Sequence, residues 1–268
     1  SPKGYVLSEE EIAVTIGKVD EVVEIELVNY FIKGNIALTK VDEDYPDNKL
    51  SGAVFEVYSD TNGDGKLDKD DTLLGEMKEL DGGVYQMSEL RYGKYLVKET
   101  KAPTGFVLDE DVYAVSIEEN GKTYTVENKA GVGFINAAQK GSLKIVKTSS
   151  DGKVEGFSFR VTGVDYDQTF KTDKNGEIVI EGLRIGDYTV SEVSDKASAG
   201  YILPADKQAT VKVDATAIVQ MHNEFRDTPK TGDDFNLGLW VSLAALSVVG
   251  AGVLGFVGYK NRKKKKED

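Results

Sequence analysis

Several residue types that build enzyme active sites are scarce or missing in this chain. It has no cysteine and one histidine among its 268 residues. Without cysteine there are no disulfides, no thiolate metal ligands and no thiol nucleophile. The single histidine, His222, alternates away from the apolar face of its predicted strand, and no Ser–His–Asp set or glycine-rich phosphate loop accompanies it. The composition therefore predicts a protein that is not an enzyme.

Basic residues are also in the minority. The chain carries 33 Lys and Arg residues against 46 Asp and Glu residues, which gives a formal net charge of −13. A surface this acidic repels nucleic-acid phosphates and anionic lipid headgroups. We therefore expect no nucleic-acid partner, and contact with a membrane only through a C-terminal segment.

That segment, residues 227–268, combines three features in order. A short motif comes first, the uncharged run Phe235–Tyr259 follows, and a basic tail of Lys260 and Arg262–Lys266 comes last. The run exceeds the about 20 residues that a helix needs to cross a bilayer. The basic tail would hold its end in the cytoplasm, so the rest of the chain would face outward. An ordinary transmembrane tail anchor is the alternative. The motif consists of Thr228, Pro229, Lys230, Thr231 and Gly232.

The order of motif, apolar span and basic tail resembles the sorting signal of Gram-positive cell-wall proteins. In that family a sortase cuts between the threonine and the glycine of the motif and joins the threonine to the wall or to another pilin. The resemblance implies a cut between Thr231 and Gly232. The family's usual first residue is leucine, whereas this chain has Thr228, and this difference leaves the class of sortase open.

The residues before the sorting signal predict an all-β protein. Short runs of Val, Ile, Tyr, Phe and Thr alternate with a period of two and are broken by Gly, Asn and Asp turns. Segment 90–99 resembles 183–192, and segment 1–7 resembles 102–108, so the chain contains internal repeats. We predict tandem β-sandwich domains. A first unit spans 31–138, a second unit spans 139–226, and residues 1–30 form the C-terminal end of a truncated domain from a longer protein.

Each unit directs one lysine, one glutamate and one asparagine towards the apolar face of its strands. Lys40, for example, shares its face with Ile36 and Leu38. Lone buried charges cost several kcal/mol, so such residues are expected to meet one another. The predicted triads are Lys40, Glu99 and Asn136 in the first unit, and Lys147, Glu192 and Asn223 in the second.

Burial of these groups favours a covalent reaction. It lowers the pKa of a lysine and raises that of a glutamate, so a neutral amine lies beside a protonated carboxyl group. The amine is then a nucleophile towards the asparagine carboxamide, and the glutamate is an acid and base for proton transfer. The predicted product is a Lys–Asn isopeptide bond, formed once per unit without turnover. A plain buried salt-bridge triad is the alternative.

The same residues carry a family resemblance. Tyr95–Phe106, Leu38–Asp42 and Leu50–Phe55 resemble the E-box and the first two strands of SpaA-like, Cna-B-type pilin domains. That family has a prealbumin-like β-sandwich whose Lys, Glu and Asn form the isopeptide bond. The second unit departs from the pattern, because Val193 replaces the threonine after its glutamate. In the first unit Asn128 is the alternative acceptor, since it too follows apolar residues on its face.

A calcium site is predicted in the first unit. Residues 60–71 match a calcium-binding loop position by position, with oxygen donors at positions 1, 3, 5, 9 and 12 and Gly65 at position 6. Flanking apolar residues indicate an insertion between strands, and a solvated hairpin turn is the alternative. The predicted Ca²⁺ ligands are Asp60, Asn62, Asp64, Asp68 and Asp71, with the backbone carbonyl of Lys66.

Together these features predict a surface or pilus-subunit protein attached covalently to the cell wall of a Gram-positive bacterium. Its expected partners are sortase, peptidoglycan or other pilin subunits, and host extracellular ligands. One alternative is an adhesin whose ligand-binding domain lies in a missing N-terminal region. A surface enzyme with a missing catalytic domain is a third hypothesis, which nothing in these residues supports.

Overall fold

The computed structural model describes residues 2–226. Within this range the chain forms seventeen β-strands and no helix, which confirms the prediction of an all-β fold. None of these residues belongs to a helix that is long and apolar enough to cross a membrane. The predicted sortase motif Thr228–Gly232 and the predicted span Phe235–Tyr259 lie outside the described residues.

The first unit is a sandwich of two sheets. One sheet has the strand order β4-β5-β1-β8, with β9 also paired to β1, and the other has the order β3-β2-β6-β7. The strands are β1 (Lys33–Asp42), β2 (Val54–Ser59), β3 (Thr72–Glu76), β4 (Lys78–Asp81), β5 (Val84–Arg91), β6 (Gly93–Lys101), β7 (Val112–Ile117), β8 (Thr123–Thr125) and β9 (Phe134–Asn136).

The second unit repeats this plan. Its sheets have the orders β13-β10-β17-β15 and β12-β11-β14-β16. The strands are β10 (Lys140–Ser149), β11 (Ser158–Gly163), β12 (Tyr166–Lys171), β13 (Glu177–Arg184), β14 (Gly186–Val193), β15 (Tyr201–Ile202), β16 (Lys207–Val211) and β17 (Thr216–Phe225).

In both units the first strand lies parallel to the last one, in the same register. Lys40 on β1 pairs with Phe134 on β9, two residues before Asn136. Lys147 on β10 pairs with Met221 on β17, again two residues before an asparagine. The units differ in continuity, because β17 runs unbroken beside β10 whereas β8 and β9 share that position beside β1. The common register places lysine and asparagine side by side in each unit.

Each unit has an apolar core between its own two sheets. The first core contains the edge-to-face rings of Phe55, Tyr85 and Phe134. The second core contains Phe159 and Tyr188, both fully buried. Aromatic and β-branched residues on alternate strand positions fill these cores because successive side chains of a strand point to opposite faces of its sheet. Each unit therefore has its own separate hydrophobic core.

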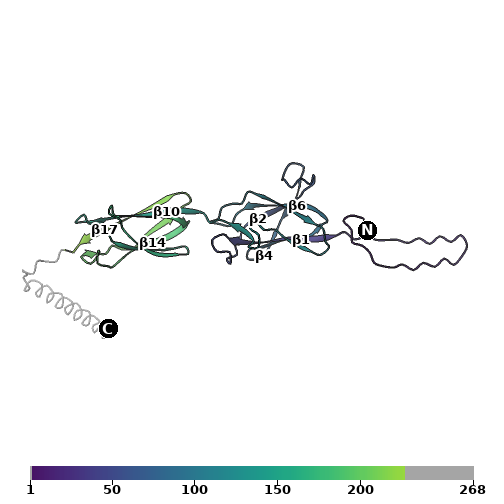
Figure 1. The fold of residues 1–268 in the computed structure, drawn as a ribbon, viewed down its shortest axis with the longest axis horizontal. Helices are drawn as coiled ribbons and strands as arrows, with labels where there is room; N and C mark the ends of the chain where they lie inside the picture. The colour runs from purple at the N-terminus through teal and green to yellow at the C-terminus, as the bar shows by residue number, and fades with distance from the viewer. Residues whose placement is uncertain (1, 227–268) are drawn as a thin grey trace, which may run out of the picture.

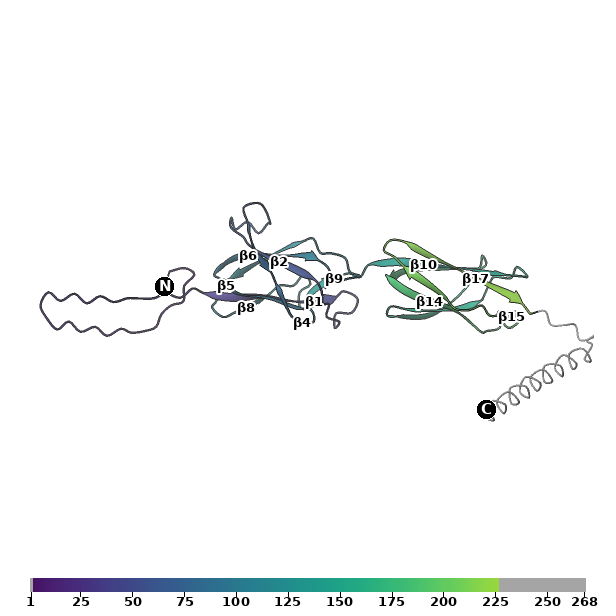
Figure 2. The ribbon, with the colours of Figure 1, turned by 180° about the vertical axis from the view of Figure 1, so that it is seen from behind.

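The two sandwiches follow one another end to end along the long axis of the molecule (Figure 1, Figure 2). In the chain, a short link of residues 137–139 between β9 and β10 joins them. Residues 2–32 contain no named strand but close on themselves through a bridge between Tyr5 and Phe31. The interpretation of this N-terminal segment as the end of a further domain stays a prediction.

Candidate functional site

The first triad lies between the two sheets of its unit. Lys40 comes from β1, Asn136 from the adjacent β9, and Glu99 from β6 in the opposite sheet. Lys40 and Glu99 are 0% exposed and Asn136 is 3% exposed. Strand alternation aims all three side chains inward, as the sequence pattern predicts. The three polar side chains are therefore buried within the apolar core of the unit.

The contacts among the three side chains are direct. The Lys40 Nζ atom lies 3.8 Å from Glu99 Oε1 and donates to the Phe134 carbonyl oxygen at 3.1 Å. The Asn136 amide donates from Nδ2 to both carboxylate oxygens of Glu99, at 3.0 and 2.9 Å. The Asn136 Oδ1 atom is buried without a hydrogen-bond partner. An unpaired buried oxygen costs free energy.

Burial shifts the pKa values of both ionisable groups towards their neutral forms. Desolvation lowers the pKa of Lys40 from 10.5 to about 8, although nearby Glu99 and Asp109 oppose this shift. Desolvation likewise raises the pKa of Glu99, against hydrogen bonds from the Asp109 backbone and from Asn136. A neutral amine beside a protonated carboxyl group is the state that nucleophilic attack on the carboxamide requires.

The second triad is assembled on equivalent strands but is bonded differently. Asn223 donates from Nδ2 to Glu192 Oε1 at 2.6 Å, while Glu192 Oε2 and Asn223 Oδ1 are buried without partners. The Lys147 Nζ atom donates to the Thr148 carbonyl oxygen and lies 4.2 Å from the centre of the Phe157 ring. Among the described residues Lys147 makes no ion pair with Glu192. Desolvation nevertheless lowers the pKa of Lys147 and raises that of Glu192.

A family model for the SpaA domain, a prealbumin-like fold domain, matches residues 34–130 and 141–225. The chain belongs to this SpaA family. The matched ranges lie within the two sandwiches described above, so the prediction of tandem prealbumin-like SpaA domains is confirmed. The match identifies the fold of both units as prealbumin-like.

Among solved structures, the chain is similar to the Bacillus anthracis TIE protein, with 26% identity and a TM-score of 0.63. The similarity covers 84% of this chain and 40% of that protein, so the chain spans less than half of its length. Two further similarities are to GBS52, the minor pilin of Streptococcus agalactiae, and to the shaft pilin SpaA of Lactobacillus rhamnosus GG. For GBS52 the identity is 18% and the TM-score 0.33, over 75% of this chain and 100% of that one. For the shaft pilin the identity is 14% and the TM-score 0.32, over 72% and 98%. No curated protein sequence matches this chain.

The alternative acceptor in the first SpaA unit, Asn128, has other partners. Its Nδ2 atom donates to Asp109 Oδ2 and to the Ile135 carbonyl, and its Oδ1 atom accepts from the Ile135 backbone amide. These bonds hold the chain that separates β8 from β9. Of the two asparagines, Asn136 is the one that contacts Glu99.

The predicted calcium loop lies between β2 and β3, as the flanking residues indicate. Its side chains accept hydrogen bonds from the backbone of the loop: Asp60 accepts from Gly63 and Gly65, and Asp71 accepts from Thr61 and Asp68. Within residues 2–226 no group of three or more His, Cys, Asp or Glu side chains is arranged to hold a metal ion. The predicted ligands Asn62, Asp64 and Lys66 continue the same turn. The Asp64 amide donates to the Asn62 side chain, and the Lys66 amide donates to the Asp64 side chain.

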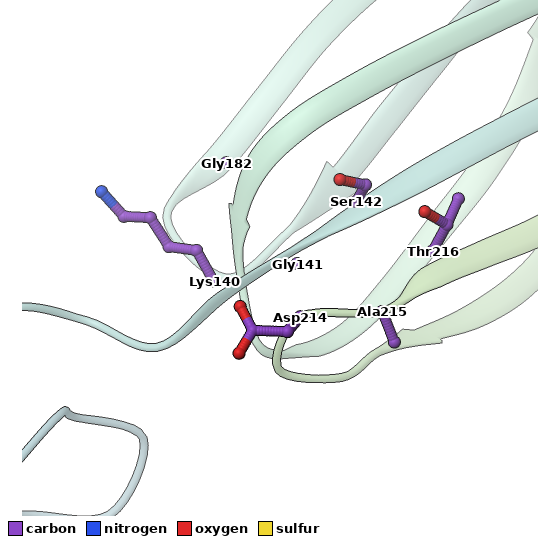
Figure 3. A pocket seen from close by; sticks show the side chains of 7 residues that line it. All are labelled: Lys140, Gly141, Ser142, Gly182, Asp214, Ala215 and Thr216. Atoms are coloured by element: carbon purple, nitrogen blue, oxygen red, sulfur yellow. The ribbon is translucent and has the colours of Figure 1, made fainter.

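An open hollow of about 310 Å³ lies where β10 begins (Figure 3). Seven residues line it, and Lys140, whose side chain extends away from it, and Asp214 are the charged ones. The lining includes no histidine and no cysteine.

Sequence reasoning missed Asp109. Its backbone amide donates to Glu99 Oε2 at 2.9 Å, and its side chain accepts from Tyr113 and Asn128. Asp109 lies in the loop between β6 and β7, where no strand period marks an inward-facing position. Its place beside the triad depends on the path of that loop, which residue spacing does not reveal.

The depressed pKa of Lys40 predicts a pH dependence of stability in a variant that cannot crosslink. In Asn136→Ala the folded state loses the Lys40 proton near pH 8, whereas the unfolded state keeps it up to pH 10.5. The unfolded state then binds more protons between these values, so the free energy of unfolding should rise with pH, by about 3 kcal/mol at most. Urea titrations at both pH values measure the change.

The double variant Lys40→Met/Asn136→Ala is the control, because it keeps every other titrating group. The pH-dependent gain should be absent from it. An equal response in the two variants would show that Lys40 keeps an ordinary pKa.

Proposed function

We propose that the chain is a stalk segment of a Gram-positive cell-surface or pilus protein, in which each SpaA unit crosslinks itself with a Lys–Asn isopeptide bond. The observation that supports the proposal is that the buried side chains of Lys40 and Asn136 both contact Glu99 between the two sheets. Three polar groups in one core cost free energy unless they pair or react. The reaction replaces an amine and a carboxamide with one neutral amide.

The proposed reaction is balanced within the triad. The lone pair of Lys40 Nζ attacks the side-chain carbonyl carbon of Asn136, and Glu99 in its acid form donates a hydrogen bond to Oδ1. Glu99 then takes a proton from the attacking nitrogen and passes one to Nδ2. The carbon–Nδ2 bond breaks, ammonia leaves, and Glu99 returns to its starting form. Burial lowers the pKa of Lys40 and raises that of Glu99, so it moves both groups towards their reactive forms.

The second SpaA unit requires one extra movement. Its carboxyl and carboxamide groups already touch, but the Lys147 amine lies over the Phe157 ring. Rotation about the lysine side chain has to bring Nζ to Asn223 before attack. We therefore expect the bond of the second unit to form more slowly than that of the first.

The crosslinks would stabilise the stalk. Each joins the first strand of a unit to the last and closes a loop that contains most of the unit. If the loop-entropy account of disulfides holds for this bond, each stabilises its unit by about 4–5 kcal/mol. Tension along the stalk would then pass through covalent bonds and bypass the noncovalent core.

Intact-mass measurement of the purified chain tests the crosslinks. We expect the loss of one ammonia per SpaA unit relative to the mass of the sequence, because each bond releases one. Glu99→Ala should abolish the loss from the first unit, and Asn128→Ala should leave it unchanged. Glu110→Ala, at an exposed position of the same unit, is the matched control and should crosslink fully. A mass equal to that of the sequence would reject the proposal.

We propose further that a sortase attaches the chain to the cell wall through Thr231. The order of motif, uncharged run and basic tail in residues 228–266 supports this proposal. Pro229 fixes its own φ and biases Thr228 towards an extended form, which suits a peptide in an enzyme groove. Peptidoglycan or another pilin subunit would supply the accepting amine.

Cell fractionation tests the attachment. The chain should appear in the cell-wall fraction, and Thr231→Ala should move it to the membrane fraction, because the bond to be cut and rejoined is lost. Lys230→Ala is the control, since the position between proline and threonine varies in the motif, and this variant should stay in the wall. Wall attachment of Thr231→Ala would contradict the role of this threonine.

We also propose that the loop of residues 60–71 binds Ca²⁺. The alternating oxygen donors and the turn at Gly65, which has φ of +76°, support it. Asp60 is the most buried of the donors and already accepts from the Gly65 amide at 3.2 Å. Binding requires Asp64 and Asp68 to exchange their hydrogen bonds with backbone amides for the ion.

Thermal melting tests the ion. Calcium at a hundredfold excess over its dissociation constant should stabilise the first unit by about 3 kcal/mol, and a chelator should remove this gain. The double variant Asp64→Asn/Asp68→Asn should abolish the response, because it removes two charges from the loop. Asp81→Asn, at an exposed position of β4, should respond as the unaltered chain does. A melting temperature that neither calcium nor chelator moves would sink the proposal.

A further inference from the structure

A cluster of charges fills the junction between the two SpaA units. Arg184, the last residue of β13, donates from Nη1 to Asp42 Oδ2 at 2.6 Å and from Nη2 to Asp42 Oδ1 at 2.8 Å. Its Nη2 atom also bonds Asp44 Oδ2 at 3.0 Å. Lys140 at the start of β10 lies 3.1 Å from the same Asp44 oxygen. The second unit thus contributes two cations to this junction, and the first contributes two carboxylates.

This junction differs from an ordinary surface ion pair. The side chain of Arg184 is 14% exposed and that of Asp42 is 3% exposed. The guanidinium also lies 4.9 Å from the centre of the Tyr45 ring and 5.8 Å from that of Phe106. Two parallel hydrogen bonds to one carboxylate are a geometry that the guanidinium of arginine makes and the ammonium of lysine does not. Although burial opposes it, the pKa of Asp42 is lowered, chiefly by the hydrogen bonds from Arg184.

Arg184 and Asp42 each accept a further hydrogen bond from their own unit. The hydroxyl group of Tyr188, a fully buried residue of β14, donates to the Arg184 carbonyl oxygen at 2.9 Å. The Asp44 backbone amide donates to Asp42 Oδ1 at 2.9 Å. The arginine and the carboxylate are therefore fixed to two different cores before they meet.

The link between the units is itself hydrogen-bonded to both of them. The Gln139 amide donates to the Gly105 carbonyl of the first unit at 2.8 Å, and the Gln139 carbonyl accepts from the Ile185 amide of the second unit at 3.1 Å. A link with both polar groups engaged in this way has little freedom to swing.

The same pattern of backbone hydrogen bonds occurs at the other end of the first unit. The Ile32 amide donates to the Gly4 carbonyl at 2.9 Å, and the Ile32 carbonyl accepts from the Tyr92 amide at 2.9 Å. Arg91, which matches Arg184 in the repeat, lies 4.1 Å from the centre of the Phe31 ring, and its carbonyl accepts from Tyr95 at 2.6 Å. The same backbone hydrogen bonds and an arginine at the matching position therefore occur at both ends of the first unit.

We propose that Arg184, Asp42 and Asp44 form a domain clamp that holds the two SpaA units at one fixed angle. Domains joined by a short link and a small interface are expected to move relative to each other. The clamp removes this motion through buried charge-assisted bonds between opposite poles of successive units. It acts whether or not the isopeptide bonds form.

Distance measurement between spin labels tests the clamp. The chain has no cysteine, so the exposed positions Lys78→Cys on β4 and Lys207→Cys on β16 carry the two labels in the full chain. The unaltered junction should give one narrow distance distribution. Arg184→Gln and Asp42→Asn should each make it roughly twice as wide, because domain motion is restored.

Arg160→Gln is the matched control. Arg160 makes a two-pronged bond to Asp167 within the second unit, with both side chains 55% exposed, so its loss should leave the distribution narrow. Asp44→Ala, in an exposed turn, tests the clamp without a buried change and should broaden the distribution less than Arg184→Gln. Equal widths for Arg184→Gln and the unaltered chain, or equal broadening by Arg160→Gln, would overturn the proposal.

Discussion

An amine, a carboxyl group and a carboxamide inside an apolar core constrain the architecture of each SpaA unit. Lys40, Glu99 and Asn136 come from β1, β6 and β9, so the triad forms only when the two sheets pack face to face. The same residues make the core expensive, because desolvation penalises each charged form. The fold therefore brings together three polar groups whose burial costs free energy, and the proposed covalent bond would remove part of that cost.

The triads were predictable because they obey strand periodicity. Lys40 follows Ile36 and Leu38 at intervals of two, and a period of two decides which face of a strand is buried. Other features of the structure leave no periodic pattern in the sequence. The path of the loop carrying Asp109, the break between β8 and β9, and the rotamer of Lys147 arise from tertiary packing. The pairing of Arg184 with Asp42 joins residues of different units, which the repeat pattern assigned to separate domains.

The two units show how far a repeated sequence preserves a site. The register of the first and last strands is the same in both, as is the contact between glutamate and asparagine. Both lysine amines lie over an aromatic ring, but among the described residues only Lys40 also makes an ion pair with the glutamate of its triad. Within the described residues, the position of Asp42 is occupied in the second unit by Ser149, which has no carboxylate. Repetition thus conserves the backbone frame more closely than the bonding of each side chain.

The split last strand of the first unit has a mechanical consequence. Pulling a parallel pair of strands from opposite ends loads their hydrogen bonds in shear, so that the bonds resist together. In the second unit eight residue pairs of β10 and β17 share the load. In the first unit the chain leaves through β9, which has three paired positions with β1. Before any crosslink forms, we therefore expect the first unit to unfold at a lower force than the second, and to gain more from a covalent bond between those two strands.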